Sequence, residues 1–237
     1  MTTDSTWTVV VPFDEAGDPH RRRALDFIVR RYQQQGLPVV VSEPPSAGGW
    51  SKGVAVDAGV RSTSTWGLVI ADADVIVSVD ALDATLGRVG SGAAWAQPHG
   101  RVYRLGENAT RHLIEGEPYR PGRASRAQGP PGGGIVVLSR DAYDTVGGID
   151  SRFVGWGGDD ISFARALDTL VGPGVRLGAP MTHLWHVPMS RRPGGRSSGR
   201  ASPESEALAG RYYDAAGDPT AMRALVSEHK VASRESR

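Results

Sequence analysis

Short runs of β-branched residues alternate with helical patterns over the first third of the chain, and this alternation constrains the fold most. The runs at 6–12, 37–42 and 66–71 predict buried strands. Between them, apolar residues at helical spacing over 19–35 and the stretch 52–60 predict two helices. This order is typical of an α/β domain with a single, mostly parallel sheet flanked by helices.

Ligands of such sheets bind beyond the carboxyl ends of the parallel strands. The residues that follow the predicted strands should therefore meet along one rim, and these are Pro12 with Phe13, Glu43, and Asp72 with Asp74. Two carboxylates at positions i and i+2 can face one divalent cation, which keeps open positions for diphosphate oxygens. The triplet alone does not identify such a site, because aspartates are also common in turns.

Composition limits the kinds of site that the chain can hold. The 237 residues include no cysteine, which excludes disulfides, zinc–thiolate sites and thiol nucleophiles. Any metal must be held by carboxylates, histidines or carbonyls, which suits Mn²⁺ or Mg²⁺. No stretch approaches the ~20 apolar residues of a membrane-spanning helix, and the first residues lack the apolar run of a secretory signal. We therefore expect a cytoplasmic protein, and the arginine- and alanine-rich composition suggests a GC-rich bacterium or its phage.

The middle of the chain has a weaker pattern. Between 90 and 131 glycine, proline and arginine accumulate, so we expect long loops or a flap there. The run at 132–139 predicts a further strand, and helices are expected from Arg140 and from Asp160. Residues 188–202 have the composition of a mobile basic loop, which is either a solvated surface or a surface for an anionic donor or acceptor.

The chain returns to a helical pattern after this loop. Residues 203–237 are therefore expected to form a C-terminal helical appendage to a main domain over 1–202. Asp218, which precedes a proline, is expected to cap the last helix. Three side chains of the appendage are expected to pack on the main domain: Leu208, Tyr212 and Tyr213.

The segment Gly-Trp-Gly-Gly-Asp-Asp at 155–160 combines three features of a carbohydrate site. Glycines allow the backbone to approach a ligand closely, and Trp156 offers a flat face for a sugar ring. Asp159 and Asp160 open a predicted helix, where negative charge is favourable and a carboxylate could deprotonate a hydroxyl. An acidic helix cap after a glycine turn would explain the two aspartates but not the tryptophan.

A histidine pair lies further along the chain. His183 and His186 are separated by two residues, and either is a candidate third protein ligand for a metal. The sequence does not decide between them, and we favour His186.

Together these elements resemble the β-1,4-galactosyltransferases and the related polypeptide N-acetylgalactosaminyltransferases. The resemblance is carried by the D-x-D triplet, a later histidine and the run PGGGIVVLSRDAYDTVGGIDSRFVGWGGDDISFARAL at 131–167, with VVVPF at 9–13 and WSKGVAVDAGV at 50–60. It extends over 9–186 and implies the GT-A fold, a Rossmann-like nucleotide-diphospho-sugar transferase fold, for a catalytic domain within 1–202.

The resemblance implies a metal site for Mn²⁺ or Mg²⁺. Asp74 would ligate the metal directly, and Asp72 would contribute to metal or ribose binding. His186 or His183 would complete the protein ligands.

It also implies catalytic and donor-binding roles. Asp160 matches the family's catalytic base, and Asp159 stands where a glutamate normally contacts the acceptor. Lys52 holds the place of a basic nucleotide-binding residue, whereas Asp57 replaces an asparagine. The residues expected to bind the nucleotide sugar are Pro12, Phe13, Glu43, Lys52, Asp57, Asp72, Gly134, Trp156, Gly157 and Gly158.

The implied function is a metal-dependent glycosyltransferase, a hexosyltransferase that uses a nucleotide-sugar donor such as a UDP-sugar. Retaining relatives usually carry asparagine in place of Asp160, so this carboxylate favours an inverting single displacement. A nucleotidyltransferase and a non-catalytic nucleotide-sugar-binding module are the alternatives. The former usually has a glycine- and arginine-rich loop after the first strand, which is absent here, and the pair Asp159-Asp160 argues against the latter. The acceptor stays open between a glycan, a protein side chain, a lipid-linked glycan and a hydroxylated base in DNA.

Overall fold

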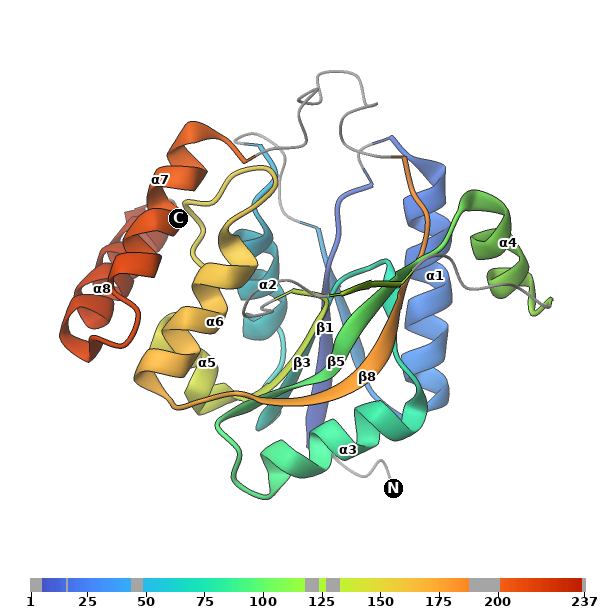
Figure 1. Ribbon diagram of the computed structural model, residues 1–237, viewed down its shortest axis with the longest axis horizontal. Helices are drawn as coiled ribbons and strands as arrows, with labels where there is room; N and C mark the ends of the chain where they lie inside the picture. Colours follow the sequence, from blue (N-terminus) through green and yellow to red (C-terminus); the bar gives the residue numbers. More distant parts are fainter. Residues whose placement is uncertain are drawn as a thin grey trace.

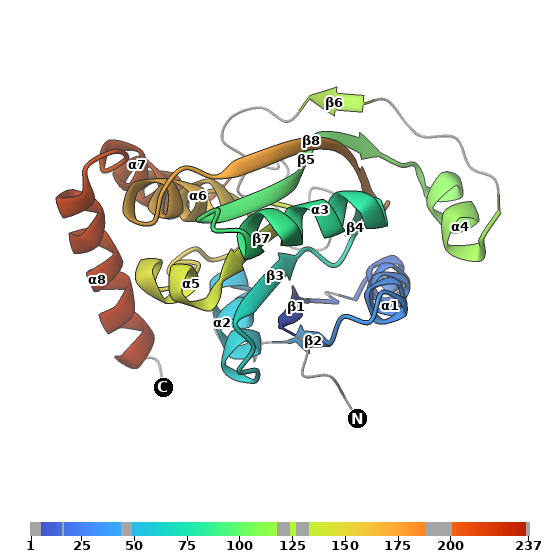
Figure 2. The same cartoon turned by 90° about the horizontal axis from the view of Figure 1, so that it is seen from below.

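One sheet runs through the centre of the computed structural model, with helices on both of its faces (Figures 1 and 2). The structure describes residues 6–15, 17–43, 49–117, 124–126, 133–187 and 201–235. The strands are β1 (Trp7–Pro12), β2 (Val39–Ser42), β3 (Gly67–Ala71), β4 (Val75–Ile76), β5 (Trp95–Arg104), β6 (Ala124–Arg126), β7 (Ile135–Ser139) and β8 (Val175–His183). The helices are α1 (Pro19–Gln34), α2 (Lys52–Arg61), α3 (Val79–Gly90), α4 (Glu107–Glu115), α5 (Arg140–Val146), α6 (Asp159–Leu170), α7 (Pro203–Asp214) and α8 (Pro219–Glu235).

The sheet has the order β2-β1-β3-β7-β5-β8-β4, with β6 paired to β5. Strands β2, β1 and β3 are parallel, as the β-α-β-α-β order of the sequence predicts. The prediction of a mostly parallel sheet is wrong beyond these strands. Strand β7 lies between β3 and β5 and runs antiparallel to both, and β4 and β6 also pair antiparallel with their neighbours. Among the described strands, β5 and β8 add the one other parallel pair.

Strand residues alternate between two apolar clusters, one on each face of the sheet. Val10 and Leu68 pack in the cluster that also contains buried residues of α2, α5 and α6. Their neighbours Val9 and Val69 pack in the cluster that contains residues of α1 and α3. Because both faces are covered, the central strands read as continuous apolar runs, and this explains why they were recognisable in the sequence.

The expectation of long loops between 90 and 131 is wrong for most of the described part of that segment. Strand β5 occupies 95–104, and α4 and β6 follow it. Pro98 and Gly100 break the apolar pattern of β5, and its pairing with β8 is irregular on both sides of His99. A Cβ on Gly100 would lie 2.9 Å from the Cα of Gly178, so the two strands approach too closely there for most side chains. Helix α3 and strand β8 were not predicted either.

Helices α7 and α8 lie outside α6, at one end of the molecule (Figures 1 and 2). Leu208 and Tyr212 are buried in the same cluster as α6. Tyr213 was expected to pack on the domain as well, but it faces away from the cluster and is 64% exposed, with the Arg165 guanidinium 4.6 Å from its ring centroid. The predicted cap is confirmed, because Asp218 accepts hydrogen bonds from the first backbone N–H groups of α8. No helix in the described ranges has the length and apolar character needed to cross a membrane.

A buried polar network joins these two helices to the segment that precedes the Gly-Trp-Gly-Gly turn. The Asp150 carboxylate is 2% exposed and accepts hydrogen bonds from Arg152 at 2.7 Å and from the Tyr212 hydroxyl at 3.0 Å. His229 of α8 lies 3.2 Å from the same carboxylate, and its other ring nitrogen lies 2.9 Å from the carbonyl oxygen of Gly147. The network therefore fixes α7 and α8 against the base of the turn.

Replacing Tyr212 with phenylalanine is expected to lower the free energy of unfolding by about 1–2 kcal/mol, because it removes one donor to a buried carboxylate that keeps its other partners. Urea unfolding measures this change. Tyr213→Phe, one residue further along α7, is the matched control and should change stability by less than about 0.5 kcal/mol, since that hydroxyl is on an exposed side chain. Equal effects of the two substitutions would contradict this account of the network.

Candidate active site

The end of β3 and the start of β7 form the floor of the candidate site. Because these strands are antiparallel, Ala71 is opposite Ile135, and Asp72 lies beside Gly134. The backbone N–H of Asp72 donates to the Gly134 carbonyl at 2.8 Å, and the Gly134 N–H donates to the Asp72 carboxylate at 3.1 Å. Gly134 has a φ of 83° and fits closely against Met181 and His99, which explains why this position is glycine.

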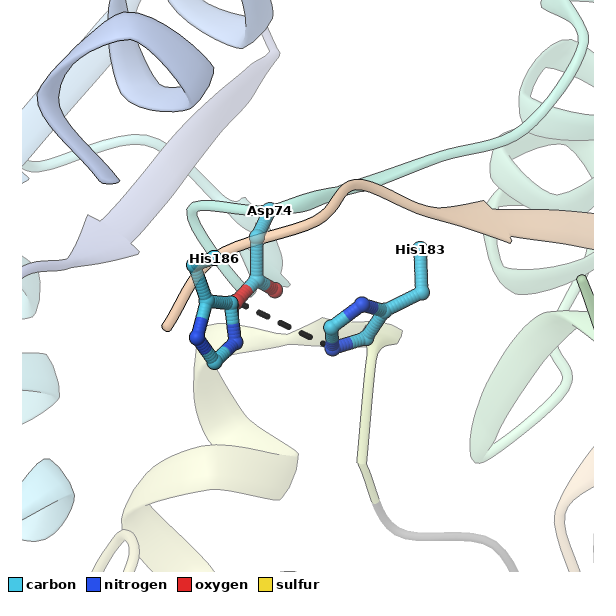
Figure 3. A group of neighbouring side chains, drawn as sticks. All are labelled: Asp74, His183 and His186. Atoms are coloured by element: carbon cyan, nitrogen blue, oxygen red, sulfur yellow. Dashed lines mark ion pairs between the residues drawn. The ribbon is translucent and has the colours of Figure 1, made fainter. Parts of the chain in front are cut away.

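Asp74, His183 and His186 form a group that could hold a metal ion (Figure 3). Their candidate ligand atoms all lie within 4.8 Å of one another. The Nε2 atom of His186 is 3.1 Å from the Asp74 carboxylate, and that of His183 is 3.9 Å away. A backbone hydrogen bond from Leu184 to the Asp74 carbonyl, 2.7 Å long, joins the turn after β3 to the end of β8. The structure thus brings together the second aspartate of the triplet and both candidate histidines.

The protonation of this group suits a divalent cation. The Nδ1 atom of His186 is 3.1 Å from the Val187 carbonyl oxygen, a contact that orients the ring with Nε2 toward Asp74. Burial lowers the pKa of His183 below its ordinary value, which favours the neutral ring. Burial opposes ionisation of Asp74, but the two histidines outweigh it and hold its pKa well below the usual range. One carboxylate and two imidazoles are a donor set that Mn²⁺ accepts.

Asp72 lies outside that group and takes part in a second cluster. Its carboxylate is 2.6 Å from the Lys52 ammonium, and the same ammonium is 2.7 Å from the Asp160 carboxylate. Lys52 comes from the first turn of α2 and Asp160 from the first turn of α6, so the cluster joins three elements far apart in sequence.

The position of Asp160 depends on a glycine in the opposite wall. A Cβ on Gly133 would collide with the Asp160 carboxylate, so glycine leaves room for the carboxylate in its present position. Burial raises the pKa of Asp160 to about 7, with Asp159 and Asp72 acting in the same direction and Lys52 against them. One ammonium cannot neutralise several carboxylates, so Asp160 is a carboxyl group that can exchange a proton near neutral pH.

The turn before α6 presents Trp156 to solvent. The three glycines of the turn all have positive φ, at 83°, 102° and 95° for Gly155, Gly157 and Gly158, which L side chains rarely adopt. Gly158 is also packed against Phe153 and Ala209, where a Cβ would lie within 2.8 and 3.2 Å of their side chains. Trp156 is 62% exposed, so its ring is accessible to a ligand.

Several predicted donor-binding residues lie apart from the two clusters. Pro12 and Phe13 end β1, and the Phe13 ring is fully buried with the Arg22 guanidinium 4.5 Å from its centroid. Glu43 pairs with Arg22 at 3.2 Å, beside an open groove of about 550 Å³ between α1 and β2. Asp57 is not brought to the site, because it pairs with Arg61 one turn along α2.

Sequence reasoning missed four residues that shape the site: Arg22, Gln97, His99 and Gly133. Gln97 donates to the Gly133 carbonyl at 3.3 Å, and His99 is almost fully buried against Gly134. Burial lowers the pKa of His99 to about 4, so its ring is neutral at neutral pH. Both side chains come from β5, whose strand character was not recognised in the sequence.

Residues 125–175, from β6 to the first residue of β8, match the family described as the N-terminal domain of galactosyltransferase. The matched segment contains the glycine turn with Trp156 and the start of α6 with Asp159 and Asp160. No curated protein sequence gives a significant match.

The solved structures with a similar fold include glycosyltransferases. The chain is 14% identical to the catalytic domain of Drosophila β1,4-galactosyltransferase 7 in complex with xylobiose, with a TM-score of 0.52 and coverage of 84% of this chain and 77% of that one. A mutant of that Drosophila enzyme with manganese, UDP-Gal and xylobiose gives 13% identity, a TM-score of 0.53 and coverage of 82% and 79%. GalNAc-T7 with UDP, GalNAc and Mn²⁺ gives 13% identity and a TM-score of 0.60, with coverage of 94% of this chain and 54% of that chain. The predicted α/β class and GT-A fold are confirmed.

Proposed function

We propose that this chain, a glycosyltransferase with the GT-A fold, transfers a hexose from a UDP-sugar to an acceptor hydroxyl with inversion, in a reaction that depends on Mn²⁺. One observation carries the proposal. Asp74, His183 and His186 form a group that could hold a metal, and Asp72, two residues before Asp74, is joined through Lys52 to the Asp160 carboxylate. The similar structures with manganese and UDP-Gal, or with UDP, GalNAc and Mn²⁺, support this choice of metal and donor.

Asp74, His183 and His186 would hold the metal. When bound, the cation would stabilise the negative charge that develops on the leaving diphosphate. The three residues are rigidly placed, because the Leu184 hydrogen bond ties the histidine segment to the backbone of Asp74. Asp72, two residues before Asp74, would contact the donor ribose, a role that the family resemblance implies.

Asp160 would act as the general base. The acceptor oxygen forms a bond to the anomeric carbon while the bond from that carbon to the donor phosphate breaks. The electron pair of the broken bond leaves with the nucleoside diphosphate, and the acceptor proton passes to the Asp160 carboxylate. Because this is one displacement at the anomeric carbon, the configuration of that carbon inverts.

The mouth of the site would bind the acceptor. The exposed face of Trp156 suits the apolar face of a sugar ring, and Asp159, at the N-terminus of α6, would accept hydrogen bonds from acceptor hydroxyls. We therefore propose a glycan acceptor. The arginine-rich stretch on which the DNA alternative depends, 188–200, lies outside the described residues.

The nucleotide end of the donor would bind further along the rim. The Glu43 side chain borders the groove beside Arg22, which has space for a nucleoside. Pro12, opposite Ser42 at the end of β1, and Phe13 after it would extend this surface. Gly134, Gly157 and Gly158 would allow close approach of the sugar and phosphates to the backbone. Asp57 would not contact the donor, because its carboxylate pairs with Arg61.

A panel of nucleotide sugars tests the function. The protein is incubated with UDP-Gal, UDP-GalNAc, UDP-Glc, UDP-GlcNAc or GDP-Man, in Mn²⁺ or in EDTA, and free nucleotide is measured with and without small glycan acceptors. We expect UDP release from at least one UDP-sugar in Mn²⁺, faster with an acceptor, and none in EDTA. Binding of the donor without release would indicate a binding module, and release of pyrophosphate from a nucleoside triphosphate would indicate a nucleotidyltransferase.

A further inference from the structure

Lys52 is an unusual residue in this chain, and its contacts indicate a role besides the binding of the nucleotide. The chain has 27 lysines and arginines together, and only two of them are lysines. The Lys52 side chain is 12% exposed, and its ammonium lies 2.6 Å from the Asp72 carboxylate and 2.7 Å from that of Asp160. A compact ammonium fits between two carboxylates at such distances, whereas the planar guanidinium of arginine needs a wider, bidentate arrangement.

The backbone around Lys52 is fixed to the segment that leads into α6. The Gly155 N–H donates to the Trp50 carbonyl at 2.7 Å, and the Ser51 hydroxyl donates to the Ser151 carbonyl at 3.0 Å. A Cβ on Gly53 would collide with the Ile149 carbonyl oxygen, so the first turn of α2 packs directly on that segment. The distance from Lys52 to Asp160 is therefore set by backbone contacts on both sides.

We propose that Lys52 is a positioning residue for the base. Its ammonium holds the Asp160 carboxylate ionised and pointed at the acceptor, and it also joins this carboxylate to Asp72 on the donor side. This inference rests on the proposed function, because it concerns the base of that reaction. It goes beyond the nucleotide-binding role that the resemblance implies for a basic residue at this position.

The charges around Asp160 explain why it needs such a partner. Asp159 on its own helix and Asp72 after β3 both disfavour its ionised form, as burial does, and Lys52 from α2 is the cation that opposes them. Burial also opposes the charge of Lys52, but Asp160, Asp72 and Asp159 outweigh it and raise the pKa of the ammonium above its ordinary value. Lys52 is therefore positively charged at neutral pH, and its removal would leave Asp160 among like charges.

The sign of the effect follows from these charges. A base must be deprotonated to act, so the acidic limb of the pH profile of kcat/KM follows the pKa of Asp160, about 7 in the native protein. Replacing Lys52 with methionine removes the charge that favours the carboxylate, so the pKa should rise by about 1–3 units. At a pH on the acidic limb of the native profile, kcat/KM of the variant should then be about tenfold lower than that of the native protein for each unit of that rise. It should recover at higher pH.

Two measurements on matched variants test the proposal. The first is an NMR titration of aspartate carboxyl carbons in the protein without donor, with the Asp160 signal assigned by its loss in Asp160→Asn. The second is the pH profile of kcat/KM for transfer, with the donor KM measured at each pH. The variants are Lys52→Met, Lys52→Arg, which keeps the charge, and the control Arg61→Met, which removes a cation from the other end of α2.

We expect the Asp160 signal and the acidic limb to move upward together in Lys52→Met and to stay near their native positions in Lys52→Arg and Arg61→Met. Thermal melting reveals whether Lys52→Met folds. If it does not, Lys52→Arg is compared with the native protein. The kcat of Lys52→Arg should then fall, because the base is displaced, while the acidic limb of its pH profile stays unchanged. A donor KM that rises in the Lys52 variants with the Asp160 titration and kcat unchanged would overturn the proposal. Failure of the proposed function would look different: the NMR shift would be present, but no donor would be consumed.

Discussion

Asp160→Asn is expected to lower kcat for sugar transfer by about 10²- to 10⁴-fold, because the amide cannot accept the acceptor proton. Asparagine has nearly the same shape as aspartate, and Gly133 leaves room for it, so the fold and the donor site should persist. The measurement is initial-rate kinetics with the best donor of the panel, together with calorimetric binding of UDP in Mn²⁺. Transfer should fall while UDP affinity changes little.

Asp159→Asn is the matched control, because it changes the neighbouring carboxylate on the same helix turn. We expect it to raise the acceptor KM and to lower kcat much less than Asp160→Asn does. Near-normal transfer by Asp160→Asn, or equal losses of kcat in the two variants, would show that the base is wrongly assigned.

The second large effect is expected at the metal group. Asp74→Asn replaces the one carboxylate among the three candidate ligands, so Mn²⁺ affinity should fall by at least about tenfold. Transfer at limiting Mn²⁺ should fall by about 10²- to 10³-fold, because the charge that stabilises the leaving diphosphate is lost with the metal. Electron paramagnetic resonance of free Mn²⁺ measures the affinity, and a Mn²⁺ titration of activity measures the rate.

Asp72→Asn separates this account from the simpler interpretation of the D-x-D triplet. Asp72 contacts Lys52 and the Gly134 backbone rather than the two histidines, so its amide variant should bind Mn²⁺ with nearly native affinity. A larger loss of Mn²⁺ affinity in Asp72→Asn than in Asp74→Asn would contradict the ligand group at Asp74, His183 and His186.

The sequence predicts the fold best where a strand is buried on both faces. Strands β1, β3 and β7 are short apolar runs, and their predicted positions agree with the structure to within a few residues. Strand β5 was not predicted, because polar residues, a proline and a glycine interrupt its apolar pattern. Gln97 and His99 turn polar side chains toward Gly133 and Gly134, and Pro98 and Gly100 lie where its pairing with β8 is irregular. No local pattern distinguishes such a strand from a loop.

The antiparallel direction of β7 in the sheet could not be predicted from the sequence either. Alternation of strands and helices predicts parallel pairing, but β7 pairs antiparallel with both of its neighbours, β3 and β5. This reversal places Gly133 and Gly134 beside Asp72 and Asp160, and it therefore builds the floor of the site. The general arrangement of the site followed from motifs, whereas its floor depended on pairing between residues far apart in sequence.

Predicted site residues that lie close together in the sequence have different partners in the structure, and their spacing does not predict this difference. Asp72 and Asp74 are two residues apart, yet one faces Lys52 and the other faces the histidines. Lys52 and Asp57 are on one helix, yet only Lys52 reaches the site, because five residues along a helix turn the side chain well away from its first direction. Side-chain partners from other elements decide these roles, and a single sequence does not reveal them.

The most direct test of the central claim is real-time proton NMR of the first sugar product formed in Mn²⁺ from the α-linked UDP-sugar that the panel identifies. Water or a small glycan can serve as acceptor, so the experiment does not need the natural acceptor. We predict that the β-anomeric signal of the product appears first, and that EDTA and Asp160→Asn suppress it. An α-anomeric first product, or a donor left intact with every acceptor in Mn²⁺, would contradict an inverting transfer by this metal group and base.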